Sequence, residues 1–263
     1  MNMEISYKMI FDVDVLLLNF NGEEIIEKTV QKIKSQRNVN INLISFDNGS
    51  SDSSKDFLRT VSDKFIERKE NGSFTSAYNQ MLGEAKSQVY LILSNDVFLD
   101  DELIISKLTS QLFKSESIRA IAPRSIRLSG EEDLIYKKGD TMISLIWTMT
   151  FGDRPANFVK ILKSKDVVLQ DSCLLIKRND DDYIFDEMVE FYFTEDQLCD
   201  RLRRTGDLNI SDAFVRHAFQ HGTNKKDSFW KVAQYRKDAL AYCRLRFGIA
   251  AFFVLTLLSL PKY

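Results

Sequence analysis

The sequence has few of the residues that build zinc sites and disulfide frameworks. Its three cysteines, Cys173, Cys199 and Cys243, lie far apart with no C-x-x-C pair, which argues against both and suits a reducing compartment. The formal net charge of -2 over 263 residues argues against a nucleic-acid partner. Residues 1–8 contain no apolar core of a signal peptide, so we expect a cytoplasmic protein.

Glycine-rich phosphate loops are also missing. No G-x-G-x-x-G follows the first apolar run, and the stretch 49–55 has Ser54 where a P-loop needs its second glycine. A dinucleotide-dependent oxidoreductase and a P-loop NTPase are therefore disfavoured. The composition, 44% hydrophobic and 28% charged, is that of an ordinary globular protein and argues against wholesale disorder.

Short apolar runs alternate with amphipathic stretches through the first half of the chain. This alternation predicts βαβ units and a mostly parallel central sheet flanked by helices, an α/β fold. The expected strands are 13–18, 40–46, 65–66, 89–93 and 118–123. The expected helices are 23–34, 52–61, 74–85 and 101–113. Later in the chain we expect strands over 167–176 and 209–216 and a helix over 194–206, whereas 141–150 fits neither pattern.

Polar residues stand at the end of strand after strand in this first half. One polar strand end is an ordinary turn or helix cap, but ligands bind at the carboxyl ends of parallel strands. Four such ends on one sheet edge therefore predict a ligand crevice. A carboxylate at the end of the 89–93 strand can hold a divalent metal, which can hold a diphosphate. The four ends are Asn19–Asn21, Asp47–Asn48, Asn71 and Ser94–Asp96.

The segment 194–206 carries a complete helix signal. Thr194 can cap its start, Glu195 and Asp196 suit the positive end of the helix dipole, and Gly206 ends it. Dipole complementation contributes about 0.3–1 kcal/mol for each acid and would by itself explain both.

The end of the chain is basic and apolar. Residues 224–263 hold eight Lys or Arg against two Asp, and 248–260 carries no charge. An apolar run of this length spans about 20 Å, less than the ~30 Å hydrocarbon core of a bilayer. The pattern therefore predicts an amphipathic helical tail that lies on a membrane surface. The alternative is a helix packed on the domain or in a homo-oligomer.

Six short motifs occur in a characteristic order and at sensible spacing between about residues 13 and 217. In that order they resemble the family-2 glycosyltransferases of the GT-A fold, more narrowly the bacterial rhamnosyltransferase-like branch. Each motif is weak alone, and the ordered set is strong. The motifs are Leu18–Gly22, Asp47–Asp52, Asn71–Phe74 with Asn79, Leu93–Val97, Phe185–Glu187 and Glu195–Arg201.

The resemblance implies a GT-A nucleotide-sugar-binding domain over residues 1–222, with a donor half (about 1–123) and an acceptor half (about 124–222), followed by the tail, 223–263. It implies an inverting transferase that moves a sugar from a nucleoside diphosphate, with a lean to dTDP-rhamnose or a UDP-sugar. The acceptor would be a glycan or lipid-linked saccharide in cell-surface polysaccharide biosynthesis, such as O-antigen or capsule. We therefore expect a cytoplasmic enzyme, peripheral on the inner face of the membrane.

Two other functions stay open at this point. One is a catalytically inactive scaffold that binds a nucleotide sugar. The other, less favoured, is a sugar nucleotidyltransferase, which should have a glycine-rich loop with a basic residue after its first strand. The sequence has Asn19–Gly22 at that place.

The resemblance also assigns roles to residues. Asp196 is the general base, with Glu195 as the alternative. Asp96 is the surviving acid of the metal-binding D-x-D, for Mg²⁺ or Mn²⁺, and His217 reaches the metal or the diphosphate, with a purely structural role as an equal alternative. The expected nucleotide-sugar contacts are Asn19, Phe20, Asp47, Asn71, Asn79, Ser94 and Asn95. The expected acceptor-side residues are Asp171, Asp186 and Glu187.

Five positions depart from the family pattern. Ser94 replaces the first acid of D-x-D, so metal affinity should depend on the substrate's phosphates. Ser73 and Tyr78 replace a usual Gly and a frequent Arg, and the latter removes a diphosphate contact. Asp171–Ser172 stands where Gly-Ala is frequent, which leaves the acceptor's identity open.

Overall fold

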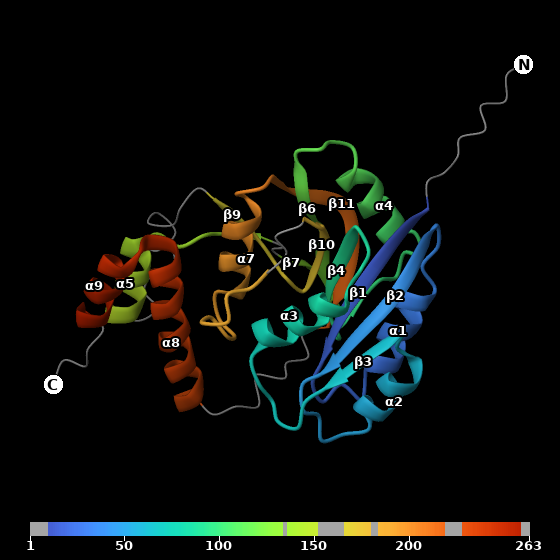
Figure 1. Cartoon of the computed structure of the whole chain (residues 1–263), viewed down its shortest axis with the longest axis horizontal. Helices are drawn as coiled ribbons and strands as arrows, with labels where there is room; N and C mark the ends of the chain where they lie inside the picture. Colours follow the sequence, from blue (N-terminus) through green and yellow to red (C-terminus); the bar gives the residue numbers. More distant parts are fainter. Residues whose placement is uncertain (1–9, 134–135, 152–165, 180–183, 219–227, 259–263) are drawn as a thin grey trace, which may run out of the picture.

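The structure, a computed structural model, describes residues 10–133, 136–151, 166–179, 184–218 and 228–258. Residues 1–8, and 223–227 and 259–263 of the expected tail, lie outside these ranges. A mixed central sheet has helices on both faces, and the last helices gather at one end of the molecule (Figure 1).

Four parallel strands in the order β3-β2-β1-β4 form half of this sheet. Their side chains point alternately to the two faces, and helices bury both faces of β1 and β4. The register pairs Asn19 with Asp47 and Leu18 with Ser94, so three polar strand ends meet at one edge. The strands are β1 (Phe11–Asn19), β2 (Val39–Asp47), β3 (Lys64–Glu67) and β4 (Val89–Ser94).

The other half of the sheet is mixed. β10 runs antiparallel to both β4 and β6, β11 runs parallel to β6, and β5 and β7 add short antiparallel pairs. The mostly parallel sheet is confirmed, although β4 has one antiparallel neighbour, which its apolar run did not indicate. These strands are β5 (Val97–Phe98), β6 (Ile118–Arg127), β7 (Glu132–Asp133), β10 (Cys173–Lys177) and β11 (Asp207–His217).

The single strand expected over 167–176 is wrong. β9 (Val167–Leu169) pairs with β8 (Tyr136–Lys138) in a separate two-stranded sheet, and the chain turns before β10 begins. Polar contacts hold this turn: Asp171 accepts a hydrogen bond from the Thr194 hydroxyl (2.9 Å), and the Ser172 carbonyl accepts one from the Ser94 amide (2.9 Å). Sequence periodicity does not report such contacts.

Helices cover both faces of the central sheet. α1, α2 and α4 bury their apolar stripes on one face, and α3 and α7 bury theirs on the other. The expected helices are confirmed, although α1, α2 and α4 begin two or three residues late because turns precede them. α7 ends at Leu202 with Arg203 as its C-cap, so Gly206 does not end it as expected. The bounds are α1 (Ile26–Lys34), α2 (Ser54–Val61), α3 (Phe74–Glu84), α4 (Ile104–Leu112) and α7 (Thr194–Leu202).

The expected tail helix is present as two helices that pack on a third. α8 (Ser228–Phe247) and α9 (Ile249–Leu258) meet α5 (Met142–Phe151), the stretch whose sequence fitted neither pattern. Gly248 between α8 and α9 has φ +88°, a left-handed conformation that glycine adopts without strain. Of the helices in the described ranges, none is long and apolar enough to cross a bilayer.

Candidate active site at the carboxyl edge of the sheet

Asn19 joins the ends of three parallel strands through its side-chain amide. Its Nδ2 donates to Asp47 Oδ1 (2.9 Å) and Ser54 Oγ (2.8 Å), and its Oδ1 accepts from Asn95 Nδ2 (2.8 Å). Asp47 also accepts from the amide and hydroxyl of Ser50 (2.8 and 2.6 Å). We call Asn19, Asp47, Ser50, Ser54 and Asn95 the Asn19 network. The polar strand ends therefore converge, as the sequence predicts.

Two glycines leave room for this edge of the site. A Cβ on Gly22 would lie 2.3 Å from Asn19 Oδ1 and 2.5 Å from Asn95 Nδ2. Gly49 has φ +79°, and a Cβ there would lie 2.5 Å from the Glu70 carbonyl carbon. The backbone thus comes close to the network at Gly22 and close to the loop after β3 at Gly49, and a Cβ fits at neither position.

Loops after β2 and β3 close the same edge. Asn48 Nδ2 donates to the Gly72 carbonyl (2.9 Å), and the Gly72 amide donates to Asn48 Oδ1 (3.1 Å). Phe20, Asn71 and Ser94 are half-buried beside these loops. Their contact with a nucleotide stays a prediction.

Asp96 and His217 lie together at the edge of the sheet. Asp96 Oδ1 is 3.2 Å from His217 Nε2, and both side chains are about nine-tenths buried, at 10% and 12% exposed. The β5–β11 register and a bond from the Ala218 amide to the Asp96 carbonyl (2.9 Å) fix this pairing.

The spacing of these two atoms suits one metal ion. Neighbouring ligands of an octahedral Mg²⁺, each about 2.1 Å from it, lie about 3 Å apart. No cluster of three or more Asp, Glu, His or Cys able to hold a metal occurs in the ranges that the structure covers. The pair could therefore supply two ligands, and substrate or water would supply the rest.

Asp196 lies in the first turn of α7 with its side chain fully buried. Its Oδ2 is 2.8 Å from Lys137 Nζ on β8, which is also 2.9 Å from Glu195 Oε2. Burial raises the pKa of Asp196, and Lys137 opposes that rise. Burial therefore disfavours the ionised form of this acid, and the cation that compensates is a lysine distant in the sequence.

Thr194 and Asp171 extend this charged group. Thr194 does not cap α7, contrary to expectation: Phe193 is the N-cap, and the Thr194 hydroxyl donates to Asp171 instead. Burial and the nearby Glu195 carboxylate raise the pKa of Asp171 well above its usual range. We call Lys137, Asp171, Thr194, Glu195 and Asp196 the Asp196 cluster.

Helix α8 holds the segment that leads into α7. The Asp238 carboxylate is fully buried and accepts hydrogen bonds from the backbone amides of Glu190 (3.0 Å), Phe191 (2.9 Å) and Tyr192 (2.9 Å). Phe193 follows with φ +61°, a strained value for a bulky residue, and its ring stacks on Tyr242 at 5.3 Å. The tail helix thus fixes where the Asp196 cluster begins.

The expected acceptor-side residues Asp186 and Glu187 lie on the segment before α7. Gln197 accepts from the Asp186 amide (2.9 Å) and donates to its carbonyl (3.3 Å). Asn79 donates to the Phe185 carbonyl (2.9 Å) and to Glu187 (3.1 Å). Asn79, expected to help close the nucleotide pocket, therefore anchors the 185–187 segment, and a nucleotide contact stays a prediction.

Three residues near the site, Lys137, Asp238 and Tyr242, are not evident from the sequence. No motif surrounds Lys137 in a stretch without clear periodicity, and Asp238 and Tyr242 look like ordinary helix residues. Only the packing of distant segments gives these three side chains a place near Asp196.

The chain matches known proteins at the level of family and fold. The family description "Glycosyl transferase family 2" matches residues 14–164. No curated protein matches the sequence. Among solved structures, glucosyl-3-phosphoglycerate synthase from Mycobacterium tuberculosis, in complex with Mn²⁺, UDP and phosphoglyceric acid, has a TM-score of 0.55 at 15% identity, with 91% of this chain and 79% of that chain covered.

Two further structures are similar. The mannosyltransferase PcManGT from Pyrobaculum calidifontis, in complex with GDP-Man and Mn²⁺, has a TM-score of 0.54 at 11% identity, covering 95% of this chain and 79% of that one. S. aureus TarS 1-349 has a TM-score of 0.54 at 11% identity, covering 93% and 80%. These likenesses show the GT-A fold. The chain has the ordered motifs and this fold, and the family description matches more than half of the chain's length. The chain therefore belongs to glycosyl transferase family 2.

Proposed function

We propose that this family-2 transferase is an inverting enzyme that passes a sugar from a nucleoside diphosphate to an acceptor hydroxyl. One observation carries the proposal: the Asp96–His217 pair and the Asp196 cluster share one edge of the sheet. Two hydrogen bonds connect them through the turn before β10. The Ser94 amide at the end of β4 donates to the Ser172 carbonyl, and the Thr194 hydroxyl of α7 donates to the neighbouring Asp171.

The chain's own residues supply a base and a metal site. Asp196 would accept the proton of the acceptor hydroxyl, and Lys137 favours its ionised form against the effect of burial. Asp96 and His217 would hold Mg²⁺ or Mn²⁺. Such an ion, when bound, offsets charge on a departing diphosphate. Mn²⁺ in the structures of the Mycobacterium and Pyrobaculum proteins supports this choice.

The donor-site proposal is tested by calorimetry with UDP, dTDP and GDP, each with and without Mg²⁺ or Mn²⁺. Wild type should bind one nucleotide tightly, in a metal-dependent way, and Asp96→Ala should lose that metal dependence. We lean to dTDP-rhamnose or a UDP-sugar as donor, and to a glycan or lipid-linked acceptor of a cell-surface polysaccharide. Failure of all three nucleotides to bind would overturn the proposal.

An inactive scaffold that binds a nucleotide sugar is the second candidate function. The observation in its favour is that Asp196 is fully buried and paired with Lys137, so an acceptor reaches it only if the pair opens. Turnover distinguishes the two functions. A scaffold binds the nucleotide but catalyses neither sugar transfer nor slow hydrolysis of the donor, whereas an enzyme catalyses at least one of these two reactions.

We also propose that α9 rests on an anionic membrane surface. Its outer face exposes Phe253, Val254 and Leu257 without any charge between Ile249 and Leu258, in a chain end with excess basic residues. Phe253→Glu with Leu257→Glu should abolish sedimentation with phosphatidylglycerol vesicles. A dimer that depends on these two residues, without vesicle binding, would contradict this and favour the oligomer.

A further inference from the structure

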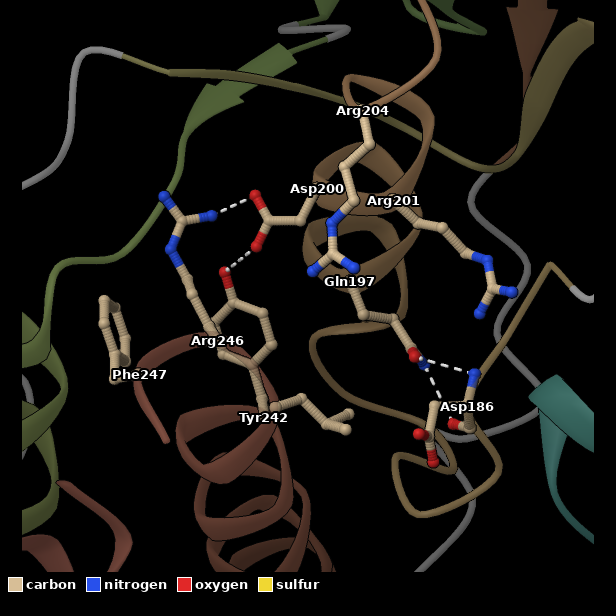
Figure 2. Close-up of a pocket in the computed structure, with 9 residues that line it drawn as sticks. Asp186, Gln197, Asp200, Arg201, Arg204, Tyr242, Arg246 and Phe247 are labelled. Carbon is tan, nitrogen blue, oxygen red and sulfur yellow. Dashed lines mark hydrogen bonds and ion pairs between the residues drawn. The ribbon is translucent and has the colours of Figure 1, made fainter. Parts of the chain in front are cut away.

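A cavity of about 490 Å³ lies between α7 and the last turns of α8, outside the Asn19 network and the Asp196 cluster. Figure 2 shows Arg201 and Arg204 extending from α7 on the side that carries Gln197, with Arg246 and Tyr242 reaching Asp200 from α8. Leu245 and Phe247 complete an apolar wall. We call this cavity the arginine pocket.

The pocket has more positive than negative charge. Three arginines and two aspartates line it, and Arg246 and Asp200 already pair with each other. Asp200 pairs with Arg246 and with Arg203 (3.3 Å) and accepts the Tyr242 hydroxyl (3.0 Å). Arg204 is exposed and has no ion pair within the described ranges.

A structural role alone does not explain this arrangement. Arginines in the last turn of a helix complement its dipole for about 0.3–1 kcal/mol each. That effect needs no cavity, whereas this one has the volume of a small-molecule site, typically about 300–1,000 Å³. The pocket also joins cationic groups to an apolar wall, as a site for an anionic group on a larger molecule requires.

The pocket adjoins the proposed base. Gln197 follows Asp196 in the chain, and its side chain holds Asp186 at the rim of the pocket. Tyr242 lines the pocket, and burial first, and then the carboxylates of Asp196 and Asp200, raise the pKa of its hydroxyl. A ligand here could therefore present a hydroxyl towards the Asp196 cluster.

We propose that the arginine pocket binds a phosphoryl group carried by the acceptor. Planar guanidinium forks match phosphate oxygens in pairs, and arginine stays charged at every relevant pH. The inference rests on the proposed transferase function, because it gives the pocket the acceptor of that reaction. The phosphoryl group comes either from a lipid headgroup or from a soluble phosphorylated molecule.

The test is calorimetric binding of inorganic pyrophosphate to the full chain in EDTA, so that no metal assists binding at Asp96. Arg204→Gln should weaken binding at least tenfold, and Arg204→Lys should weaken it less, because it keeps the charge and loses the fork. Arg244→Gln, an exposed arginine on α8 outside the pocket, is the matched control and should bind like wild type. Asp96→Asn should also bind like wild type.

Absence of pyrophosphate binding, equal binding by Arg204→Gln, or loss in Asp96→Asn would each overturn the inference. A separate measurement, metal-dependent nucleotide affinity, tests the proposed function. Arg204→Gln should leave this affinity unchanged. Two arms identify the source: glycerol 3-phosphate in solution, and phosphatidylglycerol against phosphatidylcholine vesicles. Arg204-dependent binding in either arm supports the inference and assigns the source, and its absence from both arms overturns it.

Discussion

The Asn19 network and the Asp196 cluster lie on one sheet edge but use different chemistry. In the network, neutral amides and hydroxyls satisfy a single carboxylate, Asp47, and all members come from the first 95 residues. In the cluster, three carboxylates share one lysine, and its members come from segments about 60 residues apart. The activity that depends on the cluster should therefore respond to changes of pH.

The largest expected effect is on the cluster's base. Asp196→Asn keeps the shape and removes the basic oxygen, so transferase activity should fall about 10²–10⁴-fold with nucleotide affinity unchanged. Glu195→Gln is the matched control and should lose much less. A larger loss in Glu195→Gln would make Glu195 the base. Wild-type activity in both variants would mean that the base does not lie on α7.

The next effect tests whether α8 positions the cluster. Asp238→Ala leaves three backbone amides without their acceptor, so kcat should fall about 10- to 100-fold through misplacement of α7. Asp238→Asn keeps one acceptor oxygen and should recover part of the loss. Nucleotide affinity, measured in parallel, should stay constant, and a change in affinity with unchanged kcat would contradict a positioning role.

A pH profile separates the two regions directly. The cluster's base acts only when ionised, and the pKa of Asp196 is raised by burial and held down by Lys137. Lys137→Met removes that cation, so the acid limb of kcat/KM should move to higher pH by about 1–3 units. Nucleotide affinity should be the same for Lys137→Met and wild type at each pH, because Lys137 lies outside the proposed metal pair. An unshifted acid limb would mean that a different group is the base.

The smallest expected effect concerns the backbone around the network. Gly49→Ala puts a Cβ into the Glu70 backbone at positive φ and should lower the free energy of unfolding by about 1–3 kcal/mol. Gly83→Ala, in α3 with open space around it, is the control and should raise it by about 0.5–1 kcal/mol. Urea unfolding measures both, and equal effects would contradict the close approach at Gly49.

Short-range patterns were enough to predict the first half of the molecule. Apolar runs and amphipathic stretches gave the four parallel strands and their helices, because alternation and helical periodicity depend only on neighbouring residues. The convergence of Asn19, Asp47 and Asn95 followed, since the ends of adjacent parallel strands meet at one edge. The ordered motifs predicted the family, and the family match confirms it.

The branch within the family, the roles of the site residues and the division into donor and acceptor halves stay predictions. The sheet itself draws strands from both halves. Sequence patterns did not predict the turn at 170–172 or helix α5, because polar contacts determine the turn and helix packing determines α5.

The sequence by itself determined the order of the four parallel strands and their helices, the polar edge and the identity of the acids, because these are local properties of the chain. Only the tertiary structure decided that Lys137 pairs with Asp196, that His217 meets Asp96 and that Asp238 holds the start of α7. The free energy of a buried charge depends on which groups surround it, and here those groups come from distant segments.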